Sequence, residues 1–503
     1  MSITKKELAG ILAREAGECG HTATEIEKVL AAYFDPENPE MGLEKFMDNL
    51  TLMAVAEPMT KSERSIIDAL GSVVRDVKDA RLFNDTYLGH MLTEASIPGM
   101  FGYILGIRTG SNTVAREVSF MESDLEPEAI RGLAELIGYD PEEAEGTFTS
   151  GGSMAIQTAL VARRTQMENL GVMASREHPF VVIGTPYTHY SWDKMTRIVG
   201  GPSREVVKRE VGTDHFKMDP VSLDKQLQIE AKNGNPVMAV VAIGGETETG
   251  LIDPIEQLID VASIYGVPVI VDGAYGAPYR LSRNRNLLRG IERSWATIID
   301  PHKTLHTPYS NGAVIFSTKE NAFYGFGDRD SYLGGGNHLG RKRIEGSMGP
   351  GSILSTVAVL RALGKEGLAT VYDLSLDRAE YLYQRVSDSD FLVPLFYPEL
   401  NILCFTLNRE TMDAMGISSN EQLQSVIDEL RYELDYGVRG EGGYFFSSTG
   451  LPCSDEMSTF PAEPGKGSMP VFRAVLMHPR TTNEILNEAI SGLEELIKKR
   501  IEI

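Results

Sequence analysis

Lys303 lies between two apolar runs of the sequence, residues 296–300 and 312–316. A lysine at a ligand site can form a Schiff base with an aldehyde, whereas a lysine on a solvated turn needs no such role. Asp272 ends a similar apolar run, residues 267–272. A carboxylate buried there requires a cation or a protonated group as a partner, and a turn-forming aspartate before a glycine is the alternative. Alone, each residue leaves its chemistry open.

Two other segments add glycine, hydroxyl and imidazole groups. A Ser-Gly-Gly-Ser turn at 150–153 opens into a helical pattern. Glycines allow close backbone approach and the first N–H groups of a helix bind anions, so the turn could hold a phosphate; a serine-capped helix start is the alternative. His189 comes five residues after the apolar run 180–184. Its flat ring could cover a flat cofactor, although a loop histidine is more often a solvated bystander.

Together, these features match the parts of one cofactor site. In chain order they are a phosphate cup at 150–153, a stacking ring at His189, a carboxylate for a pyridinium nitrogen at Asp272 and an amine for an aldehyde at Lys303. Pyridoxal 5'-phosphate has the four complementary groups. The sequence therefore predicts a pyridoxal 5'-phosphate enzyme.

A mainly parallel sheet is expected to position these residues. Short apolar runs alternate with longer amphipathic segments such as 254–266, which is the pattern of strands covered by helices on both faces. Ligands of such sheets bind beyond the carboxyl ends of the strands, where the four features lie. The runs that we expect to be strands are 180–184, 237–245, 267–274, 296–300 and 312–316.

The residue patterns along the chain predict three structural parts. Residues 1–95 have a helical pattern and are expected to form an N-terminal arm. Residues 96–350 should form the large cofactor-binding domain, and residues 351–503 a connecting helix and a smaller α+β domain. The Gly/Ser/Pro-rich stretch 440–470 has the composition of a long loop.

Composition excludes several classes of function. The 503 residues include 48 Lys plus Arg and 71 Asp plus Glu, and the formal charge of -23 repels nucleic acids and anionic membranes. Cys19, Cys404 and Cys453 are widely separated, so we expect no disulfide framework and no metal site. No apolar run is long enough to span a bilayer. A cytoplasmic enzyme is expected.

Six segments give the sequence a specific resemblance. They are TSGGSMAIQTALVARR at 149–164, THYSWDKM at 188–195, GGETETGLIDPIEQL at 244–258, VIVDGAYGAP at 269–278, IIDPHK at 298–303 and FRAVLMHPRTTNEILNEAI at 472–490. In order and separation they resemble the group II pyridoxal-phosphate-dependent amino-acid decarboxylases, most of all the archaeal-type tyrosine/aspartate branch. The resemblance implies fold type I, the aspartate aminotransferase-like fold, and a homodimer with shared active sites.

The resemblance also assigns roles. It implies that Lys303 links covalently to the cofactor, that Asp272 pairs with the ring nitrogen and that His189 stacks on the ring. Further cofactor contacts are implied for Gly151, Gly152, Ser153, Thr247, Ala274, His302 and Ser347. Arg473 corresponds to the arginine that meets a substrate carboxylate, and Tyr87 and His90 lie where the family begins to line its substrate pocket. Tyr332, in the glycine-rich segment 323–340, is the candidate proton donor to the α-carbon; a packing aromatic is the alternative.

The chain departs from the family pattern at five positions. These are Met154, Ile156, Glu246, Gly273 and Met348. An arginine is usual at the last of them, so its contact would come from Arg341 or Arg343. The departures bear on the substrate more than on the cofactor.

The expected reaction is decarboxylation of an L-amino acid to an amine and carbon dioxide, with tyrosine as the first candidate and aspartate or glutamate next. One alternative is a carbon–carbon lyase similar to sphingosine-phosphate lyase, and another is a variant that forms an aldehyde. A cofactor-binding regulatory subunit without catalysis is the third. That alternative predicts loss of Lys303, Asp272 or His189, and all three are present.

Overall fold

The computed structural model describes residues 84–202, 205–322, 339–436, 443–452 and 467–502. Residues 83–503 form one compact unit. Most of the N-terminal arm expected at residues 1–95 lies outside the described residues, and so does Tyr332.

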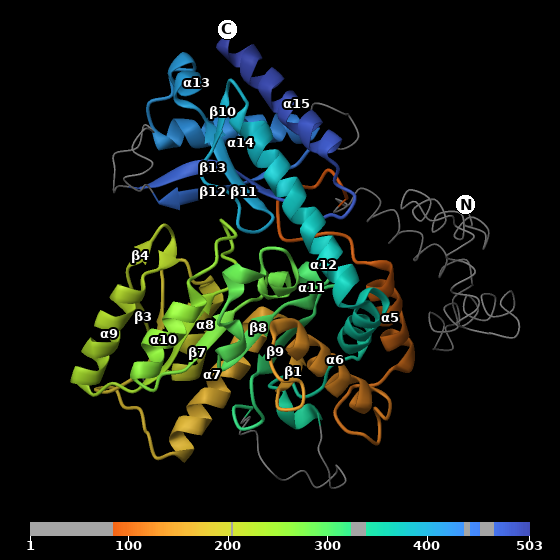
Figure 1. Cartoon of the computed structure of the whole chain (residues 1–503), viewed down its shortest axis with the longest axis vertical. Coiled ribbons are helices and arrows are strands. Elements are labelled where there is room, and N and C mark those ends of the chain that lie inside the picture. The colour runs from red at the N-terminus through yellow and green to blue at the C-terminus, as the bar shows by residue number, and fades with distance from the viewer. Residues whose placement is uncertain (1–83, 203–204, 323–338, 437–442, 453–466, 503) are drawn as a thin grey trace, which may run out of the picture. The chain divides into compact units, whose positions relative to one another are not determined.

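A seven-stranded sheet forms the centre of the larger part of this unit (Figure 1). Its order is β1-β9-β8-β7-β6-β2-β3, with β8, β7, β6, β2 and β3 parallel and β9 antiparallel to both neighbours. The strands are β1 Glu145–Thr149, β2 Phe180–Gly184, β3 Val206–Glu210, β6 Val237–Ile243, β7 Val269–Asp272, β8 Ala296–Ile299 and β9 Gly312–Phe316. The predicted α/β fold with a mainly parallel sheet is confirmed.

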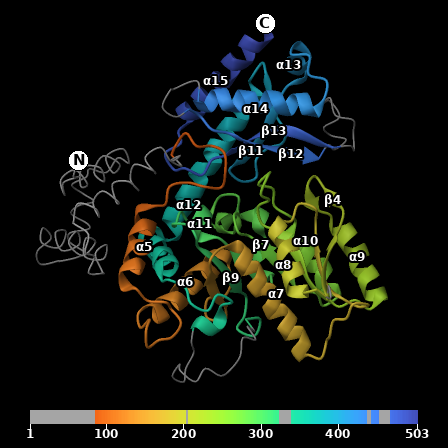
Figure 2. The same ribbon diagram turned by 180° about the vertical axis from the view of Figure 1, so that it is seen from behind.

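Helices cover both faces of this sheet because its strands are apolar on both sides. In β6, Val240 and Ala242 pack into one core layer, whereas Ala239 and Val241 pack into the other. Figure 2 shows α7 and α8 on the second face. The helices of the large part are α5 Ile97–Thr109, α6 Glu122–Ile137, α7 Gly152–Asn169, α8 Tyr190–Gly200, α9 Pro220–Asn233, α10 Ile255–Ile264 and the short α11 Pro301–Thr304.

The long helix α12, Gly351–Ser387, leads from the large part to the C-terminal part (Figure 1). Its backbone breaks at Gly364, whose φ of 58° is one that glycine adopts without a steric cost. Beyond it, an antiparallel sheet packs against helices around a separate core. The elements are β10 Leu392–Pro394, β11 Ile402–Leu407, β12 Ser447–Pro452, β13 Ser468–Val475, α13 Arg409–Ala414, α14 Asn420–Tyr436 and α15 Asn483–Ile501.

The interpretation of 440–470 as one long loop is wrong in part. Residues 447–452 form β12, which pairs with β13 along its whole length. The segment has four polar or small residues in a row, the last of them Gly450, and it ends in Pro452, so its β-pattern is weak, and the pairing with the buried β13 decides its conformation. None of the described helices is long and apolar enough to cross a membrane.

Candidate active site

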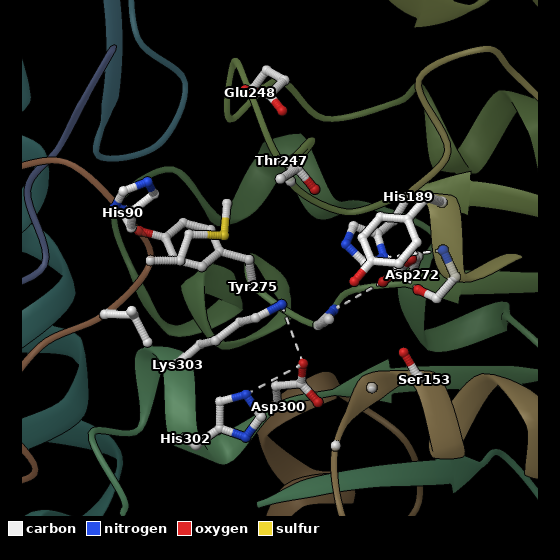
Figure 3. Close-up of a pocket in the computed structure, with 18 of the residues that line it drawn as sticks. His90, Ser153, His189, Thr247, Glu248, Asp272, Tyr275, Asp300, His302 and Lys303 are labelled. Carbon is white, nitrogen blue, oxygen red and sulfur yellow. Dashed lines mark hydrogen bonds and ion pairs between the residues drawn. The ribbon is translucent and has the colours of Figure 1, made fainter. Parts of the chain in front are cut away.

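A cavity of about 770 Å³ lies beyond the carboxyl ends of β6, β7 and β8. Figure 3 shows Lys303, Asp272 and His189 around it. The wall also includes residues 90–92 and 447–449, which are far from the sheet in sequence. The predicted residues that line the cavity are His90, Gly151, Gly152, Ser153, His189, Thr247, Asp272, Ala274, His302, Lys303 and Arg473. The structure thus brings together residues that are spread over nearly 400 positions of the chain.

Lys303 lies in α11, one helical turn after β8 ends. Its Nζ is 3.1 Å from Oδ2 of Asp300, and its side chain is 24% exposed. The Asp300 side chain is buried, and within the described part of the chain its Oδ1 has no hydrogen-bond partner. Asp300 therefore anchors the amine, and the partial exposure leaves that amine within reach of a ligand in the cavity.

Asp272 is the last residue of β7, and His189 is the N-cap of α8. The imidazole is fixed by Ser191, whose hydroxyl and backbone N–H both contact Nδ1. Burial lowers the pKa of His189, although the carboxylate of Asp272 acts in the opposite direction. Burial thus favours the neutral form of the imidazole.

The turn at 150–153 has room for a phosphate. Its Gly151 has a φ of 154°, and no side chain caps the start of α7, so the first N–H groups of that helix face the turn without a side-chain acceptor. A Cβ on Gly152 would lie 2.8 Å from Asp300, and one on Gly312 would lie 2.5 Å from Gly151, so glycine is required at both positions. Ser153 adds a hydroxyl to the wall. These residues fit the phosphate of pyridoxal phosphate.

The buried His302 completes this side of the cavity. Its Nδ1 accepts from the N–H of Asn311 at 2.9 Å, and burial lowers its pKa. Ala274 and Thr247 also lie on the wall. An amine, a carboxylate, a neutral ring and an anion cup thus share one cavity.

Comparison with known families agrees with this geometry. Residues 56–408 match the model of the pyridoxal-dependent decarboxylase conserved domain, which is more than half of the chain. The chain belongs to this family. It is therefore an amino-acid decarboxylase, a carboxy-lyase with pyridoxal phosphate as its cofactor.

Individual relatives of the decarboxylase differ in the substrates for which they are named. It is 25% identical to an aspartate 1-decarboxylase of Aliivibrio fischeri over 94% of both chains. It is 33% identical to an aromatic-L-amino-acid decarboxylase of Bacillus atrophaeus over 39% of this chain and 40% of the other. The fold matches the crystal structure of mouse CSAD, with a TM-score of 0.73, 20% identity and coverage of 89% and 92%.

A second structural match is Oryza sativa TDC with PLP and tryptamine. Its TM-score is 0.73 at 18% identity, and the match covers 92% of this chain and 96% of that one. At this identity the likeness shows the fold.

The cofactor and the protein divide the reaction between them. When bound, pyridoxal phosphate supplies an aldehyde that joins the substrate amine and a protonated ring that accepts the electrons released with carbon dioxide. The wall of the cavity presents an amine at Lys303, a carboxylate at Asp272 and a ring at His189, the residues that would hold and orient that group.

Arg473, the residue expected to meet a substrate carboxylate, is almost completely buried in β13. Its Nε donates to the carbonyl of Glu248 at 3.0 Å and its Nη1 to the carbonyl of Gly89 at 2.9 Å. Nη1 also reaches Ser447 Oγ at 3.3 Å, and Nη2 donates to the carbonyl of Thr247. Four of the five N–H groups of this guanidinium are therefore used to join three segments of the wall.

The remaining predicted residues, two for the substrate and one for the cofactor, are placed differently from one another. His90 is exposed on the wall, and its Nδ1 is hydrogen-bonded to the hydroxyl of Tyr87. Tyr87 is buried behind the wall and stacks on Phe445, with the ring centres 4.9 Å apart. Ser347 is exposed and does not line the cavity.

Arg343 is one of the two arginines expected to make the contact that an arginine at position 348 usually makes. It lies in a buried network outside the cavity. Its guanidinium pairs with Glu126 and donates to the hydroxyls of Thr113 and Thr147. This arginine is committed to linking α6, β1 and the segment before α12. It is a structural residue of the decarboxylase.

Sequence reasoning missed three residues at or beside the site. Asp300 was visible as the aspartate of the DPHK segment, and Glu248 as the second acid of the GGETETG segment. Trp192, which donates to Asp272, lies in the THYSWDKM segment with no signal of its own. Only the tertiary contacts reveal what these side chains face.

Proposed function

We propose that the decarboxylase acts on an aromatic L-amino acid, with tyrosine as the first candidate. The observation that carries this proposal is Glu248, whose carboxylate lies on the cavity wall 3.8 Å from Nε of Arg473. Its side chain is 43% exposed, so it contributes a negative charge to the space that a substrate occupies. An acidic side chain would be repelled there, whereas an uncharged ring would not.

The cations of the wall support the same preference. Lys303 and Arg473 are the lysine and the arginine among the described residues that line the cavity. Lys303 is assigned to the cofactor, and Arg473 retains one N–H group for the α-carboxylate of a substrate. A second carboxylate, as in aspartate or glutamate, has no described lysine or arginine left to pair with.

The roles of the site residues are part of the proposal. Lys303 is the residue that links to the cofactor and gives way to the substrate amine. Asp272 keeps the ring nitrogen protonated, and His189 and Ala274 lie on the two faces of the ring. The turn at 150–153 binds the phosphate. Proton return by Tyr332 and a phosphate contact from Ser347 remain predictions.

A homodimer with shared active sites is also proposed. An apolar stripe on the exposed side of α5 supports it, because a helix with such a face needs a partner. The stripe consists of Ile97, Met100, Ile104 and Ile107. Sedimentation of the purified protein tests the dimer, and cell fractionation tests the expected cytoplasmic location.

The substrate experiment uses the full chain loaded with pyridoxal phosphate. Tyrosine, phenylalanine, tryptophan, aspartate, glutamate and 2,4-diaminobutyrate are each incubated with it, and products are identified by mass. The expected result is an aromatic amine with an equal amount of carbon dioxide. Turnover of aspartate or glutamate with tyrosine unchanged would overturn the preference, and an aldehyde with ammonia would indicate the aldehyde-forming variant.

A further inference from the structure

A buried tryptophan contacts the carboxylate of the cofactor site from outside the cavity. Nε1 of Trp192 donates a hydrogen bond to Oδ2 of Asp272 at 2.7 Å. The Trp192 side chain is fully buried in the core layer formed by α7, α8 and the large sheet. Asp272 lines the cavity and Trp192 does not. The indole therefore reaches the carboxylate from the protein interior.

The second oxygen of this carboxylate has a weaker partner. Among the described residues, Oδ1 of Asp272 accepts a hydrogen bond from the backbone N–H of Ala274 at 3.4 Å. A carboxylate can accept about four hydrogen bonds, so one oxygen is held firmly and the group still has lone pairs for a ligand. One short, charge-assisted bond on Oδ2 limits rotation of the whole group.

The same helical turn supports His189. This residue caps the start of α8, and its backbone carbonyl accepts from the N–H of Trp192 at 2.9 Å. Ser191, between the two, fixes the imidazole. The first turn of α8 thus positions both the imidazole of His189 at the N-cap and, three residues later, the indole N–H of Trp192 that donates to Asp272.

We propose that Trp192 is a positioning residue, which holds the Asp272 carboxylate in the orientation that pairs with the ring nitrogen of pyridoxal phosphate. In this arrangement α8 sets the relative positions of the stacking ring and the carboxylate. The inference rests on the proposed role of Asp272. It adds a residue that touches neither cofactor nor substrate.

A purely structural role for Trp192 is the competing explanation, and the chain offers a matched control. Trp295 is the other tryptophan of the sequence and is buried in the same core layer. It packs edge-on against Phe316, away from Asp272. Trp192→Phe and Trp295→Phe remove the same atoms from one core, and only the first removes a donor from the carboxylate.

The experiment measures pyridoxal phosphate binding by the apoprotein and the visible circular dichroism of the bound cofactor. Trp192→Phe should weaken binding on the order of tenfold and change the dichroic band, because a hydrogen bond to a charged group is lost. Trp295→Phe should change binding less than about twofold, since a buried ring lost elsewhere in the layer affects packing alone. Thermal unfolding of both apoproteins checks that they are folded.

A second replacement preserves the shape of the indole. Trp192→3-benzothienylalanine replaces the N–H with sulfur and keeps the two fused rings, so it answers the question if Trp192→Phe does not fold. It should reproduce the tenfold loss. Equal binding and equal dichroism for the Trp192 and Trp295 variants would overturn the inference.

Two more variants separate this inference from the function on which it rests. Asp272→Asn should weaken binding and nearly abolish turnover, and Trp192→Phe added to it should cause no further loss of binding. Unchanged binding and turnover in Asp272→Asn would refute the role of Asp272 itself. Additive losses in the double variant would refute only the coupling between Trp192 and Asp272.

Discussion

The side of the cavity proposed for the cofactor takes its residues from strand ends and helix starts of the large sheet, whereas the side proposed for the substrate joins segments of the large part and of the C-terminal part. The cofactor side consists of residues 150–153, His189, Asp272 and Lys303. The substrate side consists of residues 89–92, 247–248, 447–449 and Arg473. The large sheet positions the residues of the cofactor side, whereas the guanidinium of Arg473 connects the segments of the substrate side.

This difference predicts how each side responds to change. On the cofactor side each side chain follows a strand or starts a helix, so the loss of one contact leaves the others in place. On the substrate side, the carbonyls of Gly89, Thr247 and Glu248 and the hydroxyl of Ser447, which belong to three segments, all accept from Arg473. A change at that residue should disturb the whole wall.

The largest effect is expected at Lys303. Lys303→Ala should lower kcat by a factor on the order of 10⁴, because the proposed covalent link to the cofactor is lost. It should also remove the visible absorbance of the cofactor–lysine linkage, while the apoprotein unfolds near its original temperature. Lys365→Ala, which changes an exposed lysine, is the control. Retention of the linkage absorbance would show that another lysine holds the cofactor.

Arg473→Lys tests the hydrogen bonds by which one guanidinium connects the segments of the substrate side. An ammonium cannot reach three divergent carbonyls, so buried acceptors lose their donors, and kcat/KM should fall about 100-fold. Pyridoxal phosphate binding should change less than about threefold, since the cofactor side stays intact. Arg385→Lys makes the same exchange at an arginine that pairs with Glu494, remote from the cavity. Equal loss of cofactor binding and of turnover would contradict the independence of the two sides.

His306 tests the region where the large part of the fold meets the C-terminal part. It borders a small cavity with Asn401 and Met477 of the C-terminal part, and burial lowers its pKa to about 4. The unfolded state binds a proton at this histidine at a higher pH than the folded state does. The free energy of unfolding therefore decreases as the pH falls from about 6.5 to about 4, by up to about 3 kcal/mol.

Chemical unfolding of the wild type and of His306→Gln across this range isolates the contribution. The variant should show the shallower decline of stability towards pH 4. Other titrating groups, such as Asp253, whose pKa burial raises to about 6, act in both proteins and cancel in the difference. Parallel curves would show that His306 is accessible to protons in the folded state.

The smallest effect is expected at Glu248. Glu248→Gln removes the negative charge from the wall and should shift the ratio of kcat/KM for aspartate over tyrosine upward by about tenfold. Cofactor binding should not change. Glu256→Gln, on the exposed surface of α10, is the control. An unchanged ratio would remove Glu248 from the account of specificity.

Much of the fold and of the cofactor side could be predicted because both depend on local patterns. The runs that form β2, β7, β8 and β9 are apolar on both faces, and their ends coincide with the chemistry-bearing residues. The weak strand β12 could not be predicted, because its conformation depends on pairing with β13. The same is true of Arg343, whose partner Glu126 lies 217 positions earlier.

The sequence alone determined the parallel sheet and the placement of the turn at 150–153, Asp272 and Lys303 near its strand ends, because strand periodicity and turn composition are local properties. The tertiary structure decided which distant groups share a wall. It placed Glu248 beside Arg473 and put the indole of Trp192 behind Asp272. Long-range packing sets these contacts, and no local spacing encodes them.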